Sequence, residues 1–403
     1  MLTDKTASVM LDGYCTLSRL RASAGKDTVP FRFLGRRATC LVGPEATRLF
    51  YDDGAFDREG VVPPPVRSTL FGDAGVQLLD GDAHRHRKSL FGSVLDHAGT
   101  ASLTETVGAA WAHATPRWRG REVVLFDESA RLLCRAVHDW AGVPLPDEDV
   151  PAVTRDLLCL VEGFAGLGPR HLAGRRARRR LEQRLEALVR DVRAGAQRSR
   201  PGSPLQQVVE HQETDGSPLD EHTAAVEVLN LLRPTVAIAW FVAFAAHALH
   251  HWPHERAAVA GSDDAATAFA HEVRRFYPLT PLLAARAVRD LTFDGVEIPE
   301  NSLGVLDVFG QDHHPDLWDR PWTFSSRRFL DRPPGAYDLV PQGGGDVHTG
   351  HRCPGEPAVV AVLAALTQRL AVQEYDVPVQ DLRVTRHRIP ARVRSRMRIA
   401  VRV

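Results

Sequence analysis

The chain has 403 residues with 50 basic and 50 acidic side chains, so its formal net charge is zero. It is 44% hydrophobic and 25% charged, which is typical of a globular protein and excludes a disordered chain or a strongly basic nucleic-acid-binding one. The opening MLTDKTASVMLDGY lacks the basic and apolar segments of a signal or transit peptide. We therefore expect a soluble, cytoplasmic protein without a nucleic-acid partner.

The five cysteines form no CxxC pair and follow no zinc-like spacing. Their odd number and spacing argue against a disulfide framework and a structural zinc site, and favour a reducing compartment. Four of them, Cys15, Cys40, Cys134 and Cys159, are predicted to be small buried side chains. Cys353 differs from these four because glycines surround it.

The N-terminal quarter of the chain is predicted to mix strands and helices. The stretch FRFLGRRATCLVG (31–43) has apolar runs on either side of a glycine turn and predicts a hairpin. Pro44 is placed to open a short helix. The proline-rich VVPPPVRSTLFG (61–72) predicts a rigid loop, and helix resumes near DAHRHRKSLFGSVL (82–95).

From about residue 127 onward the chain is predicted to be mostly helical. In 175–195, one helix face carries Leu181, Leu185, Leu188 and Val192, and arginines cover the other face as a solvated surface. A linker is predicted near 198–207. A very apolar helix follows over about 220–250, and its most apolar run, 235–249, is shorter than the roughly 20 residues that a membrane span needs. We expect a buried core helix and no membrane span.

The C-terminal part returns to mixed structure. AFAHEVRRFYP (268–278) predicts a helix, 291–308 predicts strand, turn and strand, and the alternation over 393–403 predicts a strand. The predicted fold class is therefore mainly α (α+β), helix-rich with small β-sheets near both ends.

The stretch DVHTGHRCPGE (346–356) offers three roles for Cys353. A nucleophile needs a partner histidine and an oxyanion site, and no known local signature of that chemistry is present. A buried side chain needs no glycines around it. A metal-binding thiolate needs other groups to fill the remaining ligand positions, and haem does this with four porphyrin nitrogens. The composition alone leaves all three roles open.

Residues beside Cys353 suit a haem site. Glycines let the backbone pass close to a flat cofactor, and Pro354 fits the first turn of the next helix. Backbone N–H groups at that helix start would stabilise a thiolate. His351 and Arg352 are candidates for contacts with the haem propionates.

The loop resembles the haem-binding signature of the cytochrome P450 superfamily. In that signature His or Arg stands two residues before the cysteine and Gly two after it, and His351 and Gly355 fill these places. Two positions depart from the pattern, because Asp346 replaces the usual Phe and Thr349 the usual Gly. The resemblance implies haem b with Cys353 as the axial iron ligand.

Two further motifs occur in the order that this superfamily has. EVRR contains Glu272 and Arg275 at a spacing of three, which places them on one helix face. FSSRRF resembles a later segment whose arginine, here Arg328, completes a structural triad with that pair. The resemblance covers essentially the whole chain and implies one cytochrome P450 domain over 1–403, with haem between the long central helix and the cysteine loop.

Arg233 and Pro234 are unusual in the middle of an apolar helix. Proline there costs roughly 3 kcal/mol, and a buried charge is costly unless it is paired. The superfamily usually has an acid followed by threonine in this helix, and no such pair occurs here. Either Arg233 reaches the surface and Pro234 only kinks the helix, or Arg233 faces the haem pocket and binds an anion.

The segment LNLLRPTVAIAWFVAFAAHAL (229–249) is similar to that of the bacterial fatty-acid peroxygenases within the superfamily. The resemblance implies that the substrate carboxylate pairs with Arg233 and does the acid–base work, with Pro234 shaping the helix. It also implies hydrogen peroxide as the oxidant and no dedicated redox partner.

The segment LFGDAGVQLLDGDAHRHRK (70–88) resembles the part of this branch that lines the pocket. It implies that Phe71 and Gln77 contact the substrate, that Gln77 lies near the active oxygen, and that His84 and Lys88 help to hold haem. Arg286 stands where many members have a propionate-binding arginine. Gln at the position of Gln77 favours hydroxylation over decarboxylation.

The expected function is peroxide-driven hydroxylation of a carboxylic acid, such as a fatty acid, at the α or β carbon. The alternatives are a fatty-acid decarboxylase and a secondary-metabolism oxidase acting on an aromatic or amino-acid-like acid. A haem sensor without turnover is a further alternative of another class.

Overall fold

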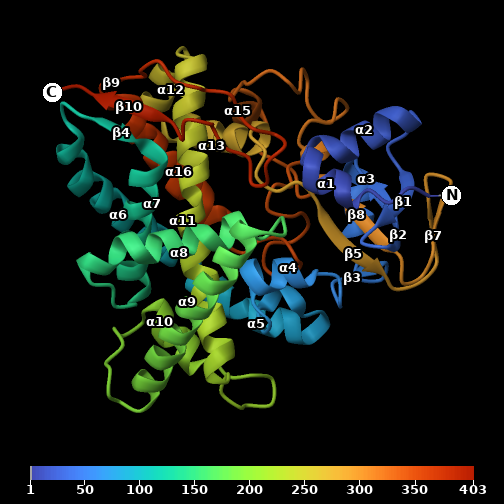
Figure 1. Cartoon of the computed structure of the whole chain (residues 1–403), viewed down its shortest axis with the longest axis horizontal. Helices are drawn as coiled ribbons and strands as arrows, with labels where there is room; N and C mark the ends of the chain where they lie inside the picture. The colour runs from blue at the N-terminus through green and yellow to red at the C-terminus, as the bar shows by residue number, and fades with distance from the viewer. Residues whose placement is uncertain (1) are drawn as a thin grey trace.

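The computed structural model describes residues 2–403 and is dominated by helices (Figure 1). The α-helices are α1 (Thr6–Asp12), α2 (Cys15–Ala24), α3 (Pro44–Phe50), α4 (Pro64–Val66), α5 (Gly81–Val94), α6 (His97–Ala114), α7 (Leu125–Ala141), α8 (Val150–Gly163), α9 (Pro169–Arg193), α10 (Pro204–Glu210), α11 (Glu221–His251), α12 (Glu255–Gly261), α13 (Asp263–Phe276), α14 (Val308–Gln311), α15 (Arg328–Asp331) and α16 (Glu356–Val372). The short helical turns are η1 (Arg67–Phe71, a π-helix), η2 (Val76–Leu78), η3 (Thr115–Trp118) and η4 (Asp147–Asp149).

The strands form three small sheets. They are β1 (Val29–Phe33), β2 (Arg36–Leu41), β3 (Phe56–Asp57), β4 (Glu122–Val124), β5 (Leu283–Ala287), β6 (Leu291–Phe293), β7 (Val296–Ile298), β8 (Leu303–Leu306), β9 (Tyr375–Asp376) and β10 (Arg398–Val401). The largest sheet has the order β1-β2-β8-β5-β3 and lies with α1 to α3 on one side of the molecule, away from most helices (Figure 1). The other two have the orders β4-β10-β9 and β6-β7. The predicted fold class, mainly α with small sheets, is confirmed.

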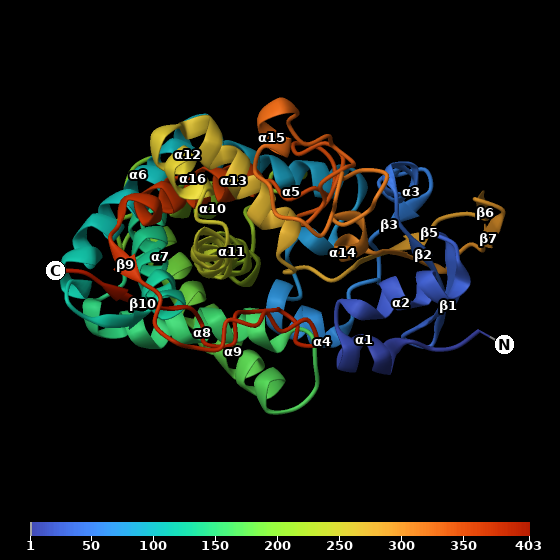
Figure 2. The same ribbon diagram turned by 90° about the horizontal axis from the view of Figure 1, so that it is seen from above.

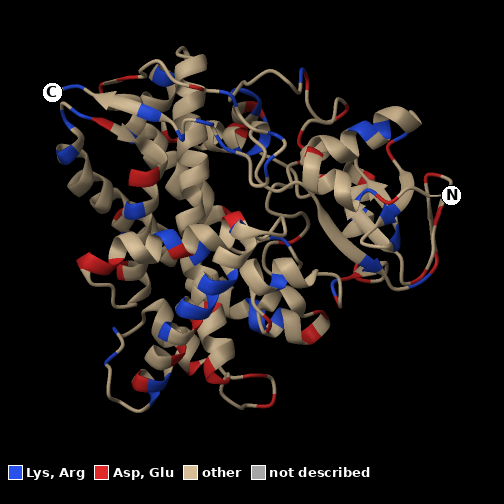
Figure 3. Ribbon diagram, viewed as in Figure 1, with Lys and Arg blue, Asp and Glu red and all other residues tan. Residues whose placement is uncertain are grey.

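Helix α11 is the central element. It packs against α7, α8, α9, α13 and α16, which surround it when it is seen along its axis (Figure 2). Asp220 begins it by accepting a hydrogen bond from the Thr223 N–H at 2.9 Å, and the helix continues through Pro234. After Arg233 it has no Lys, Arg, Asp or Glu, and it is tan there in Figure 3. By length and hydropathy it could cross a membrane, but 89% of its most apolar window is buried, as predicted for a core helix.

Three predictions about local structure were wrong. Residues 61–72 are not a plain loop, because Pro64 opens the short helix α4 and the π-helix η1 follows it. A proline loses no helix bond in a first turn, so the proline run permits this start. The predicted linker 198–207 already contains the start of α10, capped by Ser203. The C-terminal strand is only β10, because only these residues pair with β4 and β9.

Other local predictions were confirmed. Strands β1 and β2 form the expected hairpin, and its two turn residues, Leu34 and Gly35, have φ values of 51° and 74°. Cys40 and Cys134 are buried as predicted. The prediction was wrong for Cys15 and Cys159, which are partly exposed because they lie where α2 and α8 meet the solvent. That residues 1–403 form one domain stays a prediction.

Candidate active site

Cys353 lies in the loop that precedes α16, and this loop is held by backbone hydrogen bonds. The Cys353 N–H donates to the Gln342 carbonyl at 2.9 Å, and the Glu356 N–H donates to the Cys353 carbonyl at 3.2 Å. Nε2 of Gln342 is 3.9 Å from Sγ. Burial raises the pKa of the Cys353 thiol, whereas the Gly355 N–H and the Gln342 amide stabilise its anionic form. The sulfur thus faces N–H donors, as a metal-binding thiolate requires.

Asp346, the residue in place of the usual Phe, organises the loop by hydrogen bonding. Its Oδ1 accepts from the N–H groups of His348 at 2.9 Å and Thr349 at 2.7 Å, and from the Thr349 hydroxyl at 2.8 Å. The two departures from the family pattern therefore belong together, because Thr349 is a partner of Asp346. This turn replaces packing by an aromatic ring.

The glycine run before Asp346 packs on Tyr51. A Cβ at Gly343 would lie 3.1 Å from the Tyr51 hydroxyl, and one at Gly344 would lie 3.1 Å from the Tyr51 ring. Gly343 also has a φ of 94°, which disfavours any side chain. Glycine at these two positions lets the cysteine loop lie against the tyrosine.

Three of the predicted haem-binding residues lie together beside the cysteine loop. The rings of His84 and His351 stack with centroids 4.0 Å apart, and Nε2 of His351 is 3.0 Å from Oδ1 of Asp80. Lys88 Nζ donates to the carbonyls of Gly350 and Arg352. Burial lowers the pKa of His84 to about 3 and that of Lys88 to about 8. This cluster joins α5 to the loop that carries Cys353.

The other two predicted haem contacts have protein partners. Arg352 forms two hydrogen bonds with Glu356, at 2.6 and 3.1 Å. Arg286 is bonded to Asp57 at 2.6 and 3.0 Å and to Glu59 at 2.6 Å, and these carboxylates raise its pKa. Contacts of Arg352 and Arg286 with a propionate stay predictions, and both charges are already matched within the chain.

Arg58 is a cation in this region that sequence reasoning missed. Its Cζ lies 4.5 Å from the Phe50 ring centroid and 5.4 Å from that of Tyr51. Within residues 2–403 its side chain donates two long hydrogen bonds, both of 3.4 Å, to backbone carbonyls. Burial lowers the pKa of Arg58. No sequence signal distinguishes Arg58, because its neighbours DREG are typical of an ordinary surface loop.

Arg233 is buried in α11 and lacks a carboxylate partner. It is 6% exposed, its Nη1 has no hydrogen-bond partner among the described residues, and its Cζ lies 5.7 Å from the Phe71 ring centroid. Burial and then the nearby Arg178 guanidinium lower the pKa of Arg233 to about 9. The structure thus brings Arg233 and Phe71 together and excludes the alternative in which Arg233 reaches the surface.

Gln77 lies beside the same face of α11. Asn230, one helical turn before Arg233, places its Nδ2 3.4 Å from Oε1 of Gln77 and 2.8 Å from Oε2 of Glu227. Oδ1 of Asn230 is buried and has no hydrogen-bond partner in the part of the chain that the structure describes. Sequence reasoning missed Glu227 and Asn230, although their spacing of three from each other and from Arg233 was a usable signal.

Arg178 holds the segment that carries Phe71. From α9 it donates to the carbonyls of Thr69 and Leu70, both at 3.1 Å. These carbonyls lie at the end of η1, where helical partners are missing. The next residue, Gly72, has a φ of 85°, and a Cβ there would lie 2.2 Å from Nη2 of Arg178.

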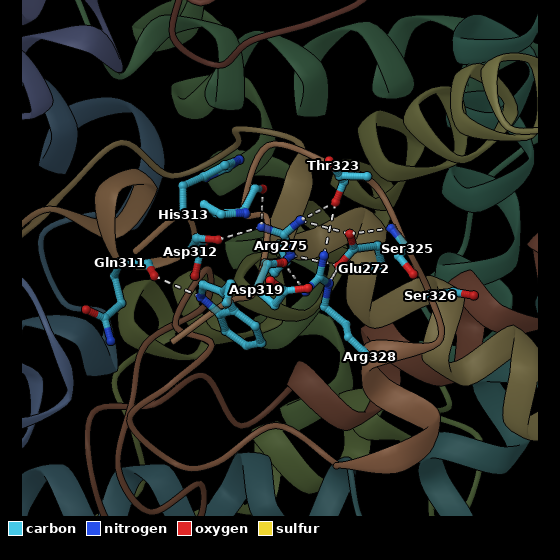
Figure 4. A network of polar contacts seen from close by, with 12 residues as sticks. Glu272, Arg275, Gln311, Asp312, His313, Asp319, Thr323, Ser325, Ser326 and Arg328 are labelled. Carbon is cyan, nitrogen blue, oxygen red and sulfur yellow. Dashed lines mark hydrogen bonds and ion pairs between the residues drawn. The ribbon is translucent and has the colours of Figure 1, made fainter. Parts of the chain in front are cut away.

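Glu272, Arg275 and Arg328 meet in one buried network (Figure 4). Arg275 donates to both Glu272 oxygens at 2.7 and 2.8 Å, and Arg328 Nε lies 3.1 Å from Glu272. Arg275 also donates to the carbonyls of Asp312 and Pro321, at 2.8 Å each. The geometry is that of the predicted triad, and it ties α13 to the segments that lead to the cysteine loop.

Comparisons with known proteins identify the family. The cytochrome P450 family model matches residues 265–370. A solved structure of cytochrome P450SP alpha in complex with (R)-ibuprofen is 39% identical, with 98% of each chain covered and a TM-score of 0.95. The chain belongs to the cytochrome P450 superfamily.

Two other P450 structures are similar: cytochrome P450EX alpha with myristic acid, and a variant of cytochrome P450 OleT in complex with arachidonic acid. The first is 36% identical with a TM-score of 0.95, and the second 33% with 0.96; both cover 99% of this chain and 98% of their own. The branch named from the sequence is confirmed.

The residues of this P450 fit the haem b that its family implies. Cys353 is surrounded by N–H donors, and cationic or histidine side chains gather beside its loop. In residues 2–403 no three His, Cys, Asp or Glu side chains form a metal site, so an iron bound by Cys353 needs its other ligands from a cofactor. A porphyrin supplies four nitrogens, and its propionates suit basic neighbours.

Proposed function

We propose that this P450 uses hydrogen peroxide to hydroxylate a carboxylic acid, a fatty acid in the first place, at the α or β carbon. The observation that carries the proposal is Arg233, a buried cation with an unpartnered nitrogen beside Phe71. A carboxylate satisfies such a guanidinium with a charge-assisted, two-pronged hydrogen bond. The similar P450 structures with myristic acid, arachidonic acid and ibuprofen support an acid as the substrate.

Residues of α11, η1 and η2 together decide where the acid lies. Arg233 binds the carboxylate and so fixes the position of the adjacent α and β carbons in the site. Phe71 covers the anchored acid and excludes water, while Gln77 fixes the polar side of the pocket. Pro234 follows Arg233 directly and shapes the helix there. These roles of Arg233, Pro234, Phe71 and Gln77 rest on the positions of the side chains and on the family resemblance.

The bound carboxylate also carries the proton. Haem b held by Cys353 would supply the iron that activates peroxide, and donation by the thiolate would favour cleavage of the O–O bond. The carboxylate beside Arg233 takes a proton from peroxide and returns it to the oxygen that leaves as water. The balance is one acid plus one hydrogen peroxide, giving one hydroxy acid and one water. The oxidant needs no electrons from a redox partner, and we propose that none is dedicated to this protein, which works in the cytoplasm.

Turnover with purified holoprotein, a free fatty acid and peroxide alone tests the proposal. We expect 2- or 3-hydroxy acid without NAD(P)H or a reductase. Arg233→Ala should weaken acid binding on the order of 100-fold, because a charge-assisted pair in a buried site is lost. Activity that needs a reductase and survives Arg233→Ala would overturn the proposal.

Two further measurements separate the alternatives. A terminal alkene in place of a hydroxy acid would identify a decarboxylase, and a preference for aromatic acids would identify the secondary-metabolism oxidase.

The reduced carbon monoxide complex should show the absorption band of thiolate-bound haem, and Cys353→Ala should abolish it. A histidine-type spectrum in the wild type would contradict the role of Cys353.

A further inference from the structure

A row of three buried polar residues runs along α11 towards the proposed acid site. Glu227, Asn230 and Arg233 follow each other at a spacing of three and are 0%, 6% and 6% exposed. Each of these residues is therefore a neighbour of the next on the helix surface. The backbone positions of Glu227 and Arg233 are six residues apart, roughly 9 Å along the helix axis.

Glu227 is an anion held by three donors. It accepts hydrogen bonds from the Val76 N–H at 2.9 Å, from Arg87 Nη1 at 3.0 Å and from Asn230 Nδ2 at 2.8 Å. A protonated carboxyl would need an acceptor, and each of these contacts is a donor. Burial raises the pKa of Glu227, whereas Asn230, Arg87 and the Val76 N–H favour the charged form. The carboxylate is accordingly fixed in position.

The contacts of Glu227 reach Gln77 by two routes. Val76 precedes Gln77 in η2, so its hydrogen bond to Glu227 fixes the backbone of that turn. Asn230, held by Glu227, has its Nδ2 3.4 Å from Oε1 of Gln77. The space is tight as well, because a Cβ at Gly75 would lie 2.7 Å from Gln77 Oε1.

Glu227 also affects the charge of the acid site. Among residues 2–403 no carboxylate lies within ion-pair distance of Arg233, and Glu227 raises its pKa while Arg178 lowers it. The fixed charge of Glu227 partly offsets the positive electrostatic potential of the acid site without forming an ion pair with the Arg233 guanidinium. It therefore weakens the attraction for a second anion.

We propose that Glu227 is a positioning residue of this site, which holds Gln77 and Asn230 in place and limits how tightly Arg233 binds an acid. The inference rests on the proposed function, since it assumes that Arg233 binds the substrate carboxylate. In this proposal Glu227 allows the hydroxy acid product to dissociate from the buried guanidinium of Arg233. A site that bound acids more tightly would release its product more slowly.

Glu227→Gln tests the inference, because it keeps the shape of the side chain and removes its charge. We expect a fatty acid to bind about tenfold more tightly, because the charge of Glu227, which opposes a second anion at this site, is lost. A fatty alcohol of equal chain length should bind as to the wild type, since it carries no charge. Affinities are measured by calorimetry on the holoprotein, and kcat and the ratio of 2- to 3-hydroxy product are measured in parallel. We expect kcat to fall and that ratio to change, because Gln77 loses its support.

Glu213→Gln is the matched control. Glu213 pairs with the same Arg87 but is partly exposed and has no contact with Asn230 or Val76. Its charge removal should leave acid affinity and the product ratio unchanged. Unchanged or weaker acid binding in Glu227→Gln would overturn the inference, as would an equal change for acid and alcohol. If Arg233→Ala leaves acid affinity intact, the proposed function itself fails; if only Glu227→Gln fails, the function stands without this role.

Discussion

At the scale of single residues, the site depends on a cation, Arg233, that has no carboxylate partner among residues 2–403. Arg233 is buried beside Phe71, and its pKa is lowered to about 9 by burial and by Arg178. A lowered pKa means that the folded protein disfavours the protonated form of Arg233, which is the form that binds a carboxylate. Acid binding and Arg233 ionisation are therefore linked.

This linkage gives a pH dependence for acid binding. The substrate carboxylate is ionised above about pH 5, and Arg233 stays protonated until the pH approaches about 9. Affinity should be constant between these limits and should fall about tenfold per pH unit above the upper one, because one proton must then be taken up on binding. Calorimetric titration of a fatty acid from pH 6 to 10.5 checks this. A fatty alcohol serves as the control, and a flat acid profile up to pH 10.5 would contradict the low pKa of Arg233.

At the scale of elements, the pocket depends on how short segments are fastened to long helices. The π-helix η1 carries Phe71, and Arg178 of α9 binds the carbonyls at its end. Gly72 follows with a positive φ and with no room for a Cβ. The position of Phe71 beside Arg233 thus depends on Arg178 and Gly72.

Gly72→Ala should disrupt the contact between Arg178 and the carbonyls at the end of η1. We expect weaker fatty-acid binding, because Phe71 shifts, and a lower Tm, because the added methyl group meets Nη2 of Arg178. Gly60→Ala is the matched control, since Gly60 has a φ of 62° but a methyl group added there would have nothing within 4 Å. It should cost only the backbone strain of about 1 kcal/mol and leave acid affinity unchanged. Equal effects of the two substitutions on acid binding would contradict the role of Arg178.

At the scale of the whole molecule, buried charges join the long helices to the cysteine loop. Glu272 links Arg275 and Arg328, and Arg275 extends to the backbone of distant segments (Figure 4). Lys, Arg, Asp and Glu occur on most helices and loops, whereas the part of α11 after Arg233 carries none (Figure 3). The triad is the part of this interior whose loss should affect the entire fold.

Glu272→Gln should be strongly destabilising. It leaves a fully buried Arg275 without its counter-charge, and breaking such a pair costs about 3–5 kcal/mol. We expect a large drop in Tm and a lower haem content, measured by thermal unfolding and by absorption. Glu45→Gln, which removes the exposed partner of Arg48, should change neither. A wild-type Tm for Glu272→Gln would refute this role.

Sequence reasoning found what is local or ordered along the chain. The long apolar helix, the Glu272–Arg275 spacing and the cysteine loop are each contained in one segment, so their patterns are visible without a structure. The spacing of Glu227 from Asn230 was visible in the sequence, but the contacts that define its role were not, because Val76 and Arg87 are 151 and 140 residues away. The π-helix after the prolines escaped because its stability comes from Arg178, on another helix. Contacts of this kind depend on the tertiary arrangement, which no local periodicity encodes.

The long helix α11 has no acid and no other charged residue between Arg233 and its end at His251. In the proposed function the missing proton carrier arrives with each molecule of substrate. An empty enzyme then meets peroxide without the group that promotes its cleavage, and it stays idle. Peroxide consumption is thereby coupled to occupancy of the acid site. Peroxide should not be consumed, and should not damage the protein, until an acid is bound beside Arg233.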